Sequence, residues 1–162
     1  MLKKSQIYGQ VFIYVIAIVV TSLIFIFGYD AIKNLNNRVD KISCIKLKNE
    51  LESAVKRMSM KYKSIERVDI QLCSNYKSLC LADYDIMNIN NIIGSDDPVI
   101  QDSISSGANK NVFLMKEIAA ESFYVGKVSV ENDVLCLNSV NNLISLKIEG
   151  GGDHAIISKW SG

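Results

Sequence analysis

The longest apolar run of the chain lies near its start. Residues 5–29 carry no charged side chain, and residues 11–27 are almost entirely aliphatic or aromatic. A helix needs about 20 predominantly apolar residues to cross the hydrocarbon core of a bilayer. A cleaved secretory signal has a shorter apolar region, of about 7–15 residues, and ends at a small-residue site that residues 28–31 match poorly. The pattern therefore predicts an uncleaved transmembrane helix over residues 6–29.

Residues 30–62 continue at helical spacing. Apolar residues that step by three and four positions share one helix face, and in the first part of this segment they are Ile32, Leu35, Val39 and Ile42. A second apolar phase starts at Leu47, after a slip of one position around Cys44. We expect an amphipathic helical extension that packs on the domain that follows, with a bend or short break near the asparagines at 34, 36 and 37.

From about residue 65 the apolar positions alternate with polar ones. This period of two is typical of half-buried strands, and it is clearest over residues 66–72. Further strand-like segments are 78–82, 112–118, 122–130, 134–137, 143–148 and 155–158. Turn-forming residues separate the last five of them, at 119–121, 131–133, 138–142 and 150–153. Because the connections are short, we expect antiparallel pairing.

A short helix is predicted within this strand-rich part. Ser95, two aspartates and Pro98 form a helix start, and Gly107 is a typical helix end. Residues 83–93 are ambiguous between helix and loop. The fold class is therefore α+β, a long N-terminal helix packed on an antiparallel β-sheet, with residues 63–162 forming the sheet domain. The roughly 130 residues beyond the apolar run suffice for one core.

Basic and acidic residues are almost balanced. The chain has 18 Lys and Arg against 17 Asp and Glu, a net charge of +1. Nucleic-acid binders show a strong basic excess, so we expect no nucleic-acid partner. Lys3 and Lys4 precede the apolar run, and the next basic residue is Lys33. The positive-inside rule therefore predicts a cytoplasmic N-terminus and an extracellular domain.

Four cysteines, Cys44, Cys73, Cys80 and Cys136, lie on the predicted outer side. An even number in an exported domain is typical of two disulfides. Cys80 and Cys136 sit in strand-like runs, so we expect these two to pair and Cys44 to pair with Cys73. A local Cys73–Cys80 bridge is the alternative. Structural zinc sites usually place paired cysteines about two to four residues apart, closer than any pair here.

The segment around the start of the apolar run resembles a known processing signal. Lys4-Ser5-Gln6-Ile7-Tyr8-Gly9-Gln10 is similar to the class III signal of archaeal type IV pilin-like proteins, in which a short basic leader and a small residue precede a Gln and the apolar helix. The resemblance implies that a prepilin-type peptidase removes residues 1–5 by cutting between Ser5 and Gln6.

The resemblance also bears on assembly and on the fold. The fifth mature residue of this family is usually a Glu that helps subunits join a filament, and here it is Gln10. This departure fits a minor pilin or pseudopilin better than a major filament subunit. The order of retained helix, amphipathic extension and exposed sheet is also the layout of type IV pilins, although many archaeal pilins carry an immunoglobulin-like β domain instead.

The sequence offers no candidate catalytic, cofactor or metal site. With His154 as the single histidine, a His-rich metal site is excluded, and we expect this residue to start the last strand. Glycines 150–152 lack the helix and the Lys-Ser/Thr pair of a phosphate-binding loop. Asp83 and Asp85 come nearest to a calcium loop but lack its spacing. We therefore expect a protein that is not an enzyme.

These observations lead to two functional expectations. The first is a membrane-anchored, extracytoplasmic pilin-like subunit at the cell surface, which forms homo- or hetero-oligomers through its N-terminal helix. The alternative is a membrane-tethered binding module that does not polymerise and that would use segments 119–122, 131–133 and 138–142. Assembly of the pilin type requires the cut before Gln6, whereas tethering does not.

Overall fold

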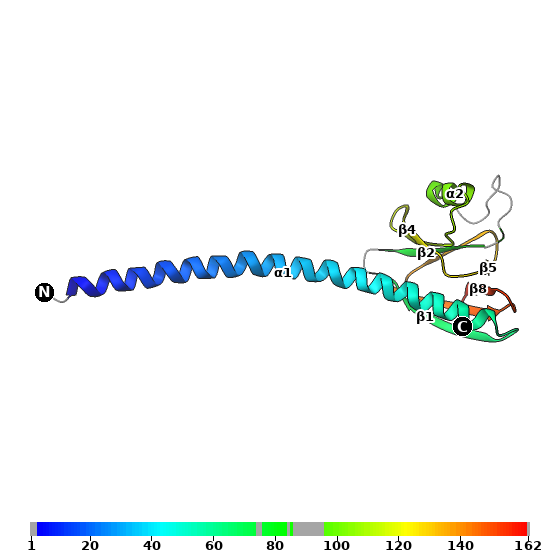
Figure 1. Cartoon of the computed structure of the whole chain (residues 1–162), viewed down its shortest axis with the longest axis horizontal. Helices are drawn as coiled ribbons and strands as arrows, with labels where there is room; N and C mark the ends of the chain where they lie inside the picture. Colours follow the sequence, from blue (N-terminus) through cyan, green and yellow to red (C-terminus); the bar gives the residue numbers. More distant parts are fainter. Residues whose placement is uncertain (1–2, 74–75, 84, 86–95, 162) are drawn as a thin grey trace. The chain divides into compact units, whose positions relative to one another are not determined.

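The computed structural model describes residues 3–73, 76–83, 85 and 96–161 (Figure 1). It comprises two units, residues 1–39 and residues 40–162, here named the N-terminal unit and the C-terminal unit. Helix α1 (Lys3–Ser59) contributes to both. Most of the ambiguous segment 83–93 lies outside the described residues.

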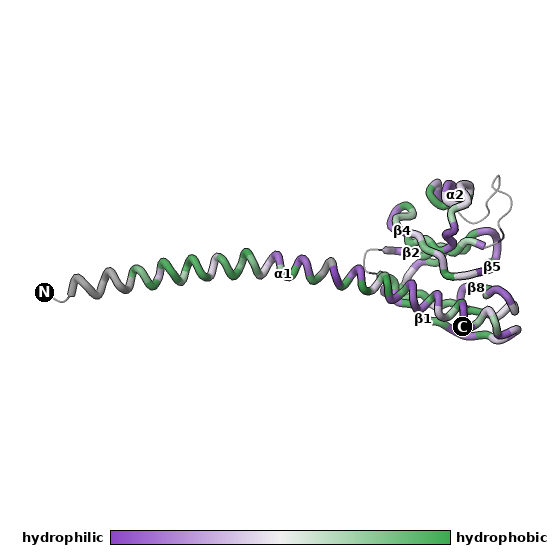
Figure 2. The backbone as a smooth tube through the Cα atoms, in the orientation of Figure 1, coloured by the Kyte–Doolittle hydropathy of each residue, from purple (hydrophilic) through white to green (hydrophobic). Residues whose placement is uncertain are grey.

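In its described residues, the N-terminal unit consists of the first part of helix α1, which continues into the C-terminal unit. Its large apolar side chains are exposed throughout residues 11–27, and the hydrophobic character of this stretch is visible as a green run in Figure 2. The expected break near Asn34 is absent from the described course of α1, which is helical through this region. An asparagine costs a helix only about 0.7 kcal/mol relative to alanine, which is too little to stop it.

In the C-terminal unit α1 buries one stripe. Leu47, Leu51, Val55 and Met58 recur at helical spacing and are at most 2% exposed, as expected for a helix face that packs on a domain. The helix ends at Ser59, slightly before the expected residue 62, and a hydrogen-bonded turn leads into the first strand.

The described strands of the C-terminal unit form two four-stranded sheets. Sheet A has the order β1 (Ile65–Gln71), β7 (Leu143–Gly150), β8 (Ala155–Lys159), β5 (Val128–Val130). Sheet B has the order β4 (Ala119–Phe123), β3 (Val112–Met115), β2 (Ser78–Ala82), β6 (Val134–Asn138). Every strand pair is antiparallel except β5–β8, which is parallel.

One core cluster joins side chains of α1 with side chains of both sheets. A smaller cluster lies between sheet B and helix α2 (Pro98–Ser105), where Ile100 packs with Phe113 and Cys80. The α+β class with a long helix on antiparallel-rich sheets is therefore confirmed. The start of α2 agrees with its sequence signal, because the Asp97 carboxylate accepts the N–H groups of Val99 and Ile100.

The sequence predicts one antiparallel sheet, whereas the described strands form two sheets. Two of the predicted segments also have other bounds. The predicted turn at 119–121 is the start of β4, and the predicted strand 122–130 is divided between the two sheets. The division has a visible cause. The buried side chain of Asn111 accepts a hydrogen bond from Val125 N (3.1 Å) and donates one to Gly126 O (2.6 Å), which holds the chain out of either ladder at this point.

Two disulfides tie the C-terminal unit together. Cys44 of α1 is bonded to Cys73, which follows β1, and Cys80 of β2 is bonded to Cys136 of β6. These are the pairs that the sequence favours over a local Cys73–Cys80 bridge. A native disulfide in a small domain typically contributes about 2–5 kcal/mol. Disulfides are typical of oxidising, extracytoplasmic compartments.

Candidate functional site

The most distinctive surface of the N-terminal unit is the apolar run at residues 11–27. Its large apolar side chains are between 46% and 73% exposed, with Ile16 and Phe25 at the two extremes. The run is long and apolar enough to cross a membrane, and none of its most apolar window is buried. Since water is a poor solvent for so much contiguous apolar surface, the run needs a lipid or protein environment.

Two of the hydroxyl side chains in this run, those of Thr21 and Ser22, are satisfied within the helix itself. Thr21 Oγ donates to the carbonyl of Ala17 (2.7 Å), and Ser22 Oγ donates to the carbonyl of Ile18 (2.8 Å). A polar group in hydrocarbon must find its hydrogen bond inside the protein. These bonds therefore remove the main cost of placing the two hydroxyl groups in a membrane.

The described residues of the predicted leader, Lys3 to Ser5, lie at the start of α1. The structure places Ser5, Gln6 and Gln10 in helical backbone, and their side chains are outside the described part of the chain. Processing of this segment and the role of Gln10 stay predictions.

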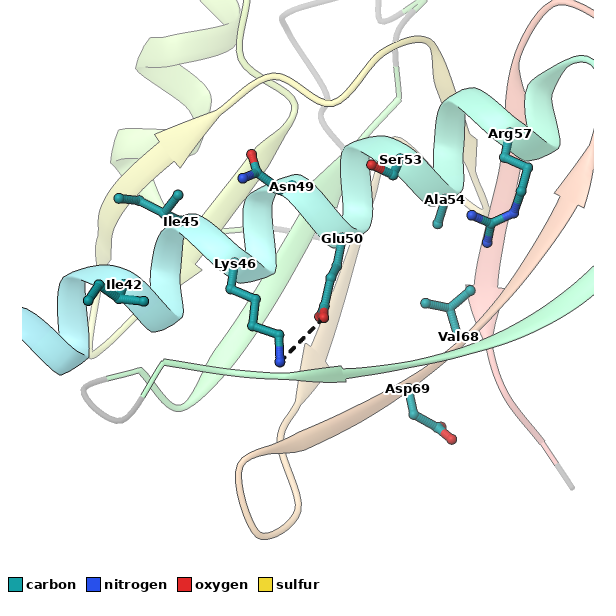
Figure 3. A pocket seen from close by; sticks show the side chains of 10 residues that line it. All are labelled: Ile42, Ile45, Lys46, Asn49, Glu50, Ser53, Ala54, Arg57, Val68 and Asp69. Atoms are coloured by element: carbon teal, nitrogen blue, oxygen red, sulfur yellow. Dashed lines mark ion pairs between the residues drawn. The ribbon is translucent and has the colours of Figure 1, made fainter.

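A shallow groove of about 650 Å³ runs along α1 in the C-terminal unit (Figure 3). Exposed Ile42 and Ile45 lie at one end of its lining, with exposed fractions of 64% and 58%. The charged groups along it are paired, because Lys46 lies 3.6 Å from Glu50 and Arg57 donates at 2.6 Å to Glu66. The charged residues of its lining, Lys46, Glu50, Arg57 and Asp69, carry no net charge.

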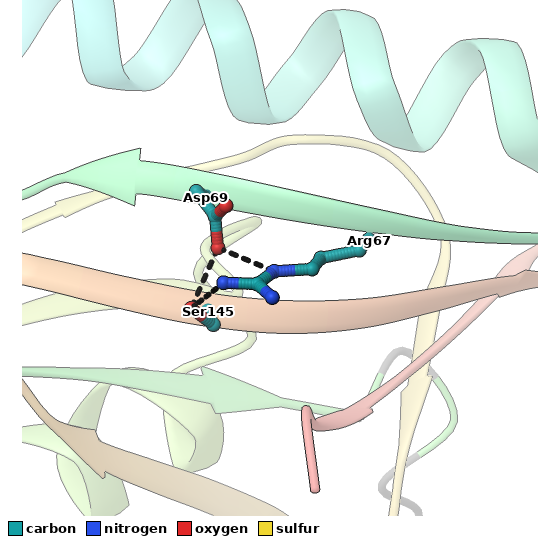
Figure 4. A network of polar contacts seen from close by, with 3 residues as sticks. All are labelled: Arg67, Asp69 and Ser145. Carbon is teal, nitrogen blue, oxygen red and sulfur yellow. Dashed lines mark hydrogen bonds and ion pairs between the residues drawn. The ribbon is translucent and has the colours of Figure 1, made fainter. Parts of the chain in front are cut away.

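The most connected polar cluster lies on sheet A (Figure 4). Asp69 of β1 and Ser145 of β7 are directly opposite in the strand register, and Ser145 Oγ donates to Asp69 Oδ1 at 2.6 Å. Arg67 Nε donates to the same oxygen at 2.9 Å, and the guanidinium lies 5.5 Å from the centre of the Trp160 ring. The hydrogen bond from Ser145, and then that from Arg67, lowers the pKa of Asp69.

The lowered pKa of Asp69 gives a pH prediction. A carboxyl group with a depressed native pKa stabilises the fold above its ordinary pKa of 3.8, and this contribution disappears as the pH falls through the native pKa. As the pH is lowered below about 4, we expect the free energy of unfolding to decrease less steeply for Asp69→Asn than for the parent protein. The measurement is urea unfolding at several acidic pH values, with Ser145→Ala as an intermediate case. Identical acid dependence in all three proteins would contradict the role given to Asp69.

The other titratable candidates have structural partners. Asp83 Oδ2 accepts hydrogen bonds from Ser129 Oγ (2.9 Å) and Val130 N (3.0 Å), so this carboxylate joins the end of β2 in sheet B to β5 in sheet A. Its other oxygen accepts the N–H of Asp85. The residue proposed as the nearest approach to a calcium ligand thus holds the two sheets together.

His154 lies directly before β8, where the sequence places it. Its Nδ1 is 2.7 Å from an oxygen of Asp153, and the hydrogen bond lowers the pKa of that carboxyl. Tyr76 Oη donates to Glu121 at 3.0 Å, and partial burial, followed by this bond, raises the tyrosine pKa. Within the described residues, no group of three or more His, Cys, Asp or Glu could hold a metal ion.

Comparison with known proteins gives no match to a family model, to a curated protein or to a solved structure. The residues and geometry of this chain are therefore the basis on which a function can be assigned to it.

Proposed function

We propose that the protein is a membrane-anchored, non-enzymatic subunit of the pilin-like kind, which acts in assembly or interaction at the cell surface. The observation that carries the proposal is the exposed apolar run at residues 11–27, which directly follows the leader-like residues Ser5, Gln6 and Gln10. The proposal places this run in the bilayer and, in an assembly, against the same helix of neighbouring subunits.

The orientation is part of the same proposal. Lys3 and Lys4 precede the run, which supports a cytoplasmic N-terminus. The two disulfides of the C-terminal unit support an oxidising environment on the other side. A prepilin-type peptidase would act on the cytoplasmic side and leave the apolar helix in the mature protein. The Gln at position 10 supports a minor pilin or pseudopilin role.

The test is the intact mass of the protein purified from membranes of its native host. We expect a mass that lacks residues 1–5 and carries no alkylated thiols unless the sample is first reduced. The matched control is Ser5→Arg, which replaces the small residue before the cut and should keep its full-length mass.

Two results would overturn parts of the proposal. A full-length mass, or loss of Met1 alone, would refute pilin-type processing and favour the tethered binding module. Free thiols in the unreduced protein would contradict the extracytoplasmic location of the C-terminal unit.

A further inference from the structure

Residues 30–39, the end of the N-terminal unit, carry a narrow apolar stripe. Its members are Ile32, Leu35 and Val39, and every other residue of the segment except Ala31 is polar or charged. The sequence predicts that this stripe packs on the domain that follows. In the structure the three side chains are instead 62%, 60% and 59% exposed. The stripe is therefore an apolar surface that the described residues do not bury.

The charged residues of this segment indicate that it lies in water. Asp30, Lys33 and Arg38 are too costly to place in the hydrocarbon of a bilayer. Apolar side chains gain free energy on association where water surrounds them, whereas lipid tails solvate them as well as another helix does. The stripe thus gains more from a covering partner than the apolar run of residues 11–27 does.

The stripe has the spacing and the residue types of a coiled-coil seam. In a heptad written abcdefg, Ile32 and Val39 occupy a positions and Leu35 occupies the d position between them. β-Branched residues at a with Leu at d favour parallel two-stranded coiled coils. Of the e and g positions between residues 29 and 38, only Arg38 is charged, so like charges do not face each other across such a pair there.

The same heptad register continues back into the apolar run. A shallow groove of about 330 Å³ lies along α1 in that run. Four of its lining residues occupy a or d positions of the register, and these are Tyr14, Ile18, Thr21 and Phe25. The other two, Ala17 and Ser22, are small. Small side chains let a second helix approach closely within a membrane, so the groove and the stripe form one continuous line, here named the seam.

We propose that the seam contacts the seam of a second copy of this chain, in a parallel two-stranded coiled coil. The proposal rests on the proposed function in one respect, because anchoring in one membrane makes the copies parallel and places their stripes at the same distance from the bilayer. Like positions then meet around a twofold axis. The proposal goes further by naming the contacting residues, the number of chains and their register.

The geometry and the length of the seam fit this partner. A straight α-helix drifts by about 20° per heptad relative to the seam, so the two helices wind into a left-handed supercoil. The stripe beyond the apolar run is short for a coiled coil in solution. Confinement of both chains to one membrane raises their effective concentration and offsets this shortness.

The experiment introduces single cysteines into the full chain, which is then oxidised in lipid vesicles. All four native cysteines are in disulfides, so the new thiol is the one free thiol. Leu35→Cys and Ile32→Cys place it on the seam. Asn34→Cys and Lys33→Cys are the matched controls, because each lies one residue away and therefore about 100° around the helix.

We expect disulfide-linked dimers from the two seam variants and at least about tenfold fewer from the two controls. A second pair of variants tests the seam without moving the thiol. Leu35→Arg, added to Ile32→Cys, should lower the yield of dimer at least about tenfold, because it replaces an apolar contact in both chains. Asn34→Arg adds the same charge beside the seam and should leave the yield unchanged.

Three results would overturn the proposal. Equal cross-linking at all four positions would indicate random collision. No cross-linking at the seam would exclude the pair, and a thiol at position 35 that also resists maleimide would show that the chain covers its own stripe. A trimer or tetramer in native mass spectrometry of the parent protein would exclude two strands.

The intact mass separates this proposal from the proposed function. Loss of residues 1–5 without cross-links would support pilin-type processing and refute the seam contact. Cross-links between full-length chains would support the seam contact and refute pilin-type processing.

Discussion

Replacing Gly150 by alanine is expected to lower the free energy of unfolding of the C-terminal unit by about 1–3 kcal/mol or more. Gly150 ends β7, and a Cβ added there would overlap the carbonyl oxygens of Lys61 and Met58. These are backbone atoms of the last turn of α1 and of the turn that follows it. The turn is held by hydrogen bonds from Lys63 N to Gly150 O (2.8 Å) and from Gly150 N to Ser64 O (3.0 Å). The overlap therefore cannot be relieved by rotating a side chain.

The measurement is urea unfolding of the full chain in a mild detergent, followed by the fluorescence of Trp160. Gly28→Ala is the matched control, since no atom would lie within 4 Å of the added Cβ. We expect this variant to unfold at the parent urea concentration. A Gly150→Ala protein within about 0.5 kcal/mol of the parent would show that the contact between β7 and the turn is looser than the structure indicates.

The main elements of the fold follow from local patterns in the sequence. The buried stripe at Leu47 and Leu51 is visible as apolar residues at helical spacing, and the edges of β1, β2 and β7 fall near the ends of alternating segments. The start of α2 is recognisable because a proline at the first helical position is typical of a helix start, although the cap is Asp97, which the sequence pattern places in the first turn. These signals depend on neighbouring residues alone, so they can be seen without the structure.

The division of segment 122–130 between two sheets could not be predicted in this way. Its period of two is correct for both β4 and β5, and periodicity does not indicate where a chain leaves one sheet for another. The deciding contact comes from the buried side chain of Asn111, fourteen and fifteen positions earlier than the backbone groups it holds. Gly126, with φ of 112°, is the local signal that could have marked the crossing.

Some of the candidate sites could likewise be predicted from the sequence, whereas others could not. The apolar run and the leader-like residues around Gln6 are properties of a short segment, so the sequence alone indicates them. The groove lined by Leu135, Val140 and Trp160 depends on the separation of β6 and β7 into different sheets, which no local pattern indicates. The expected loops included 138–142, which does contain the turn between β6 and β7 at this groove. They also included 119–122, all of which the structure assigns to β4.

The last prediction distinguishes the two faces of α1 in the C-terminal unit. We expect Leu51→Ala to lower the free energy of unfolding by about 2–5 kcal/mol. Leu51 is fully enclosed, with 0% exposure, in the cluster that joins α1 to both sheets. Alanine removes contacts to the helix and to the sheets at once, and the surrounding backbone is too constrained to close the cavity completely.

Ile45→Ala is the matched control, because Ile45 lies on the same helix but is 58% exposed. Truncating an exposed side chain usually changes stability by less than about 0.5 kcal/mol, so urea unfolding should separate the two variants clearly. Similar losses for both would mean that the outer face of α1 is covered in the folded protein. A small loss for Leu51→Ala would contradict the core as described, whereas the expected difference would leave the Ile45 face of α1 available for contacts that do not stabilise the fold.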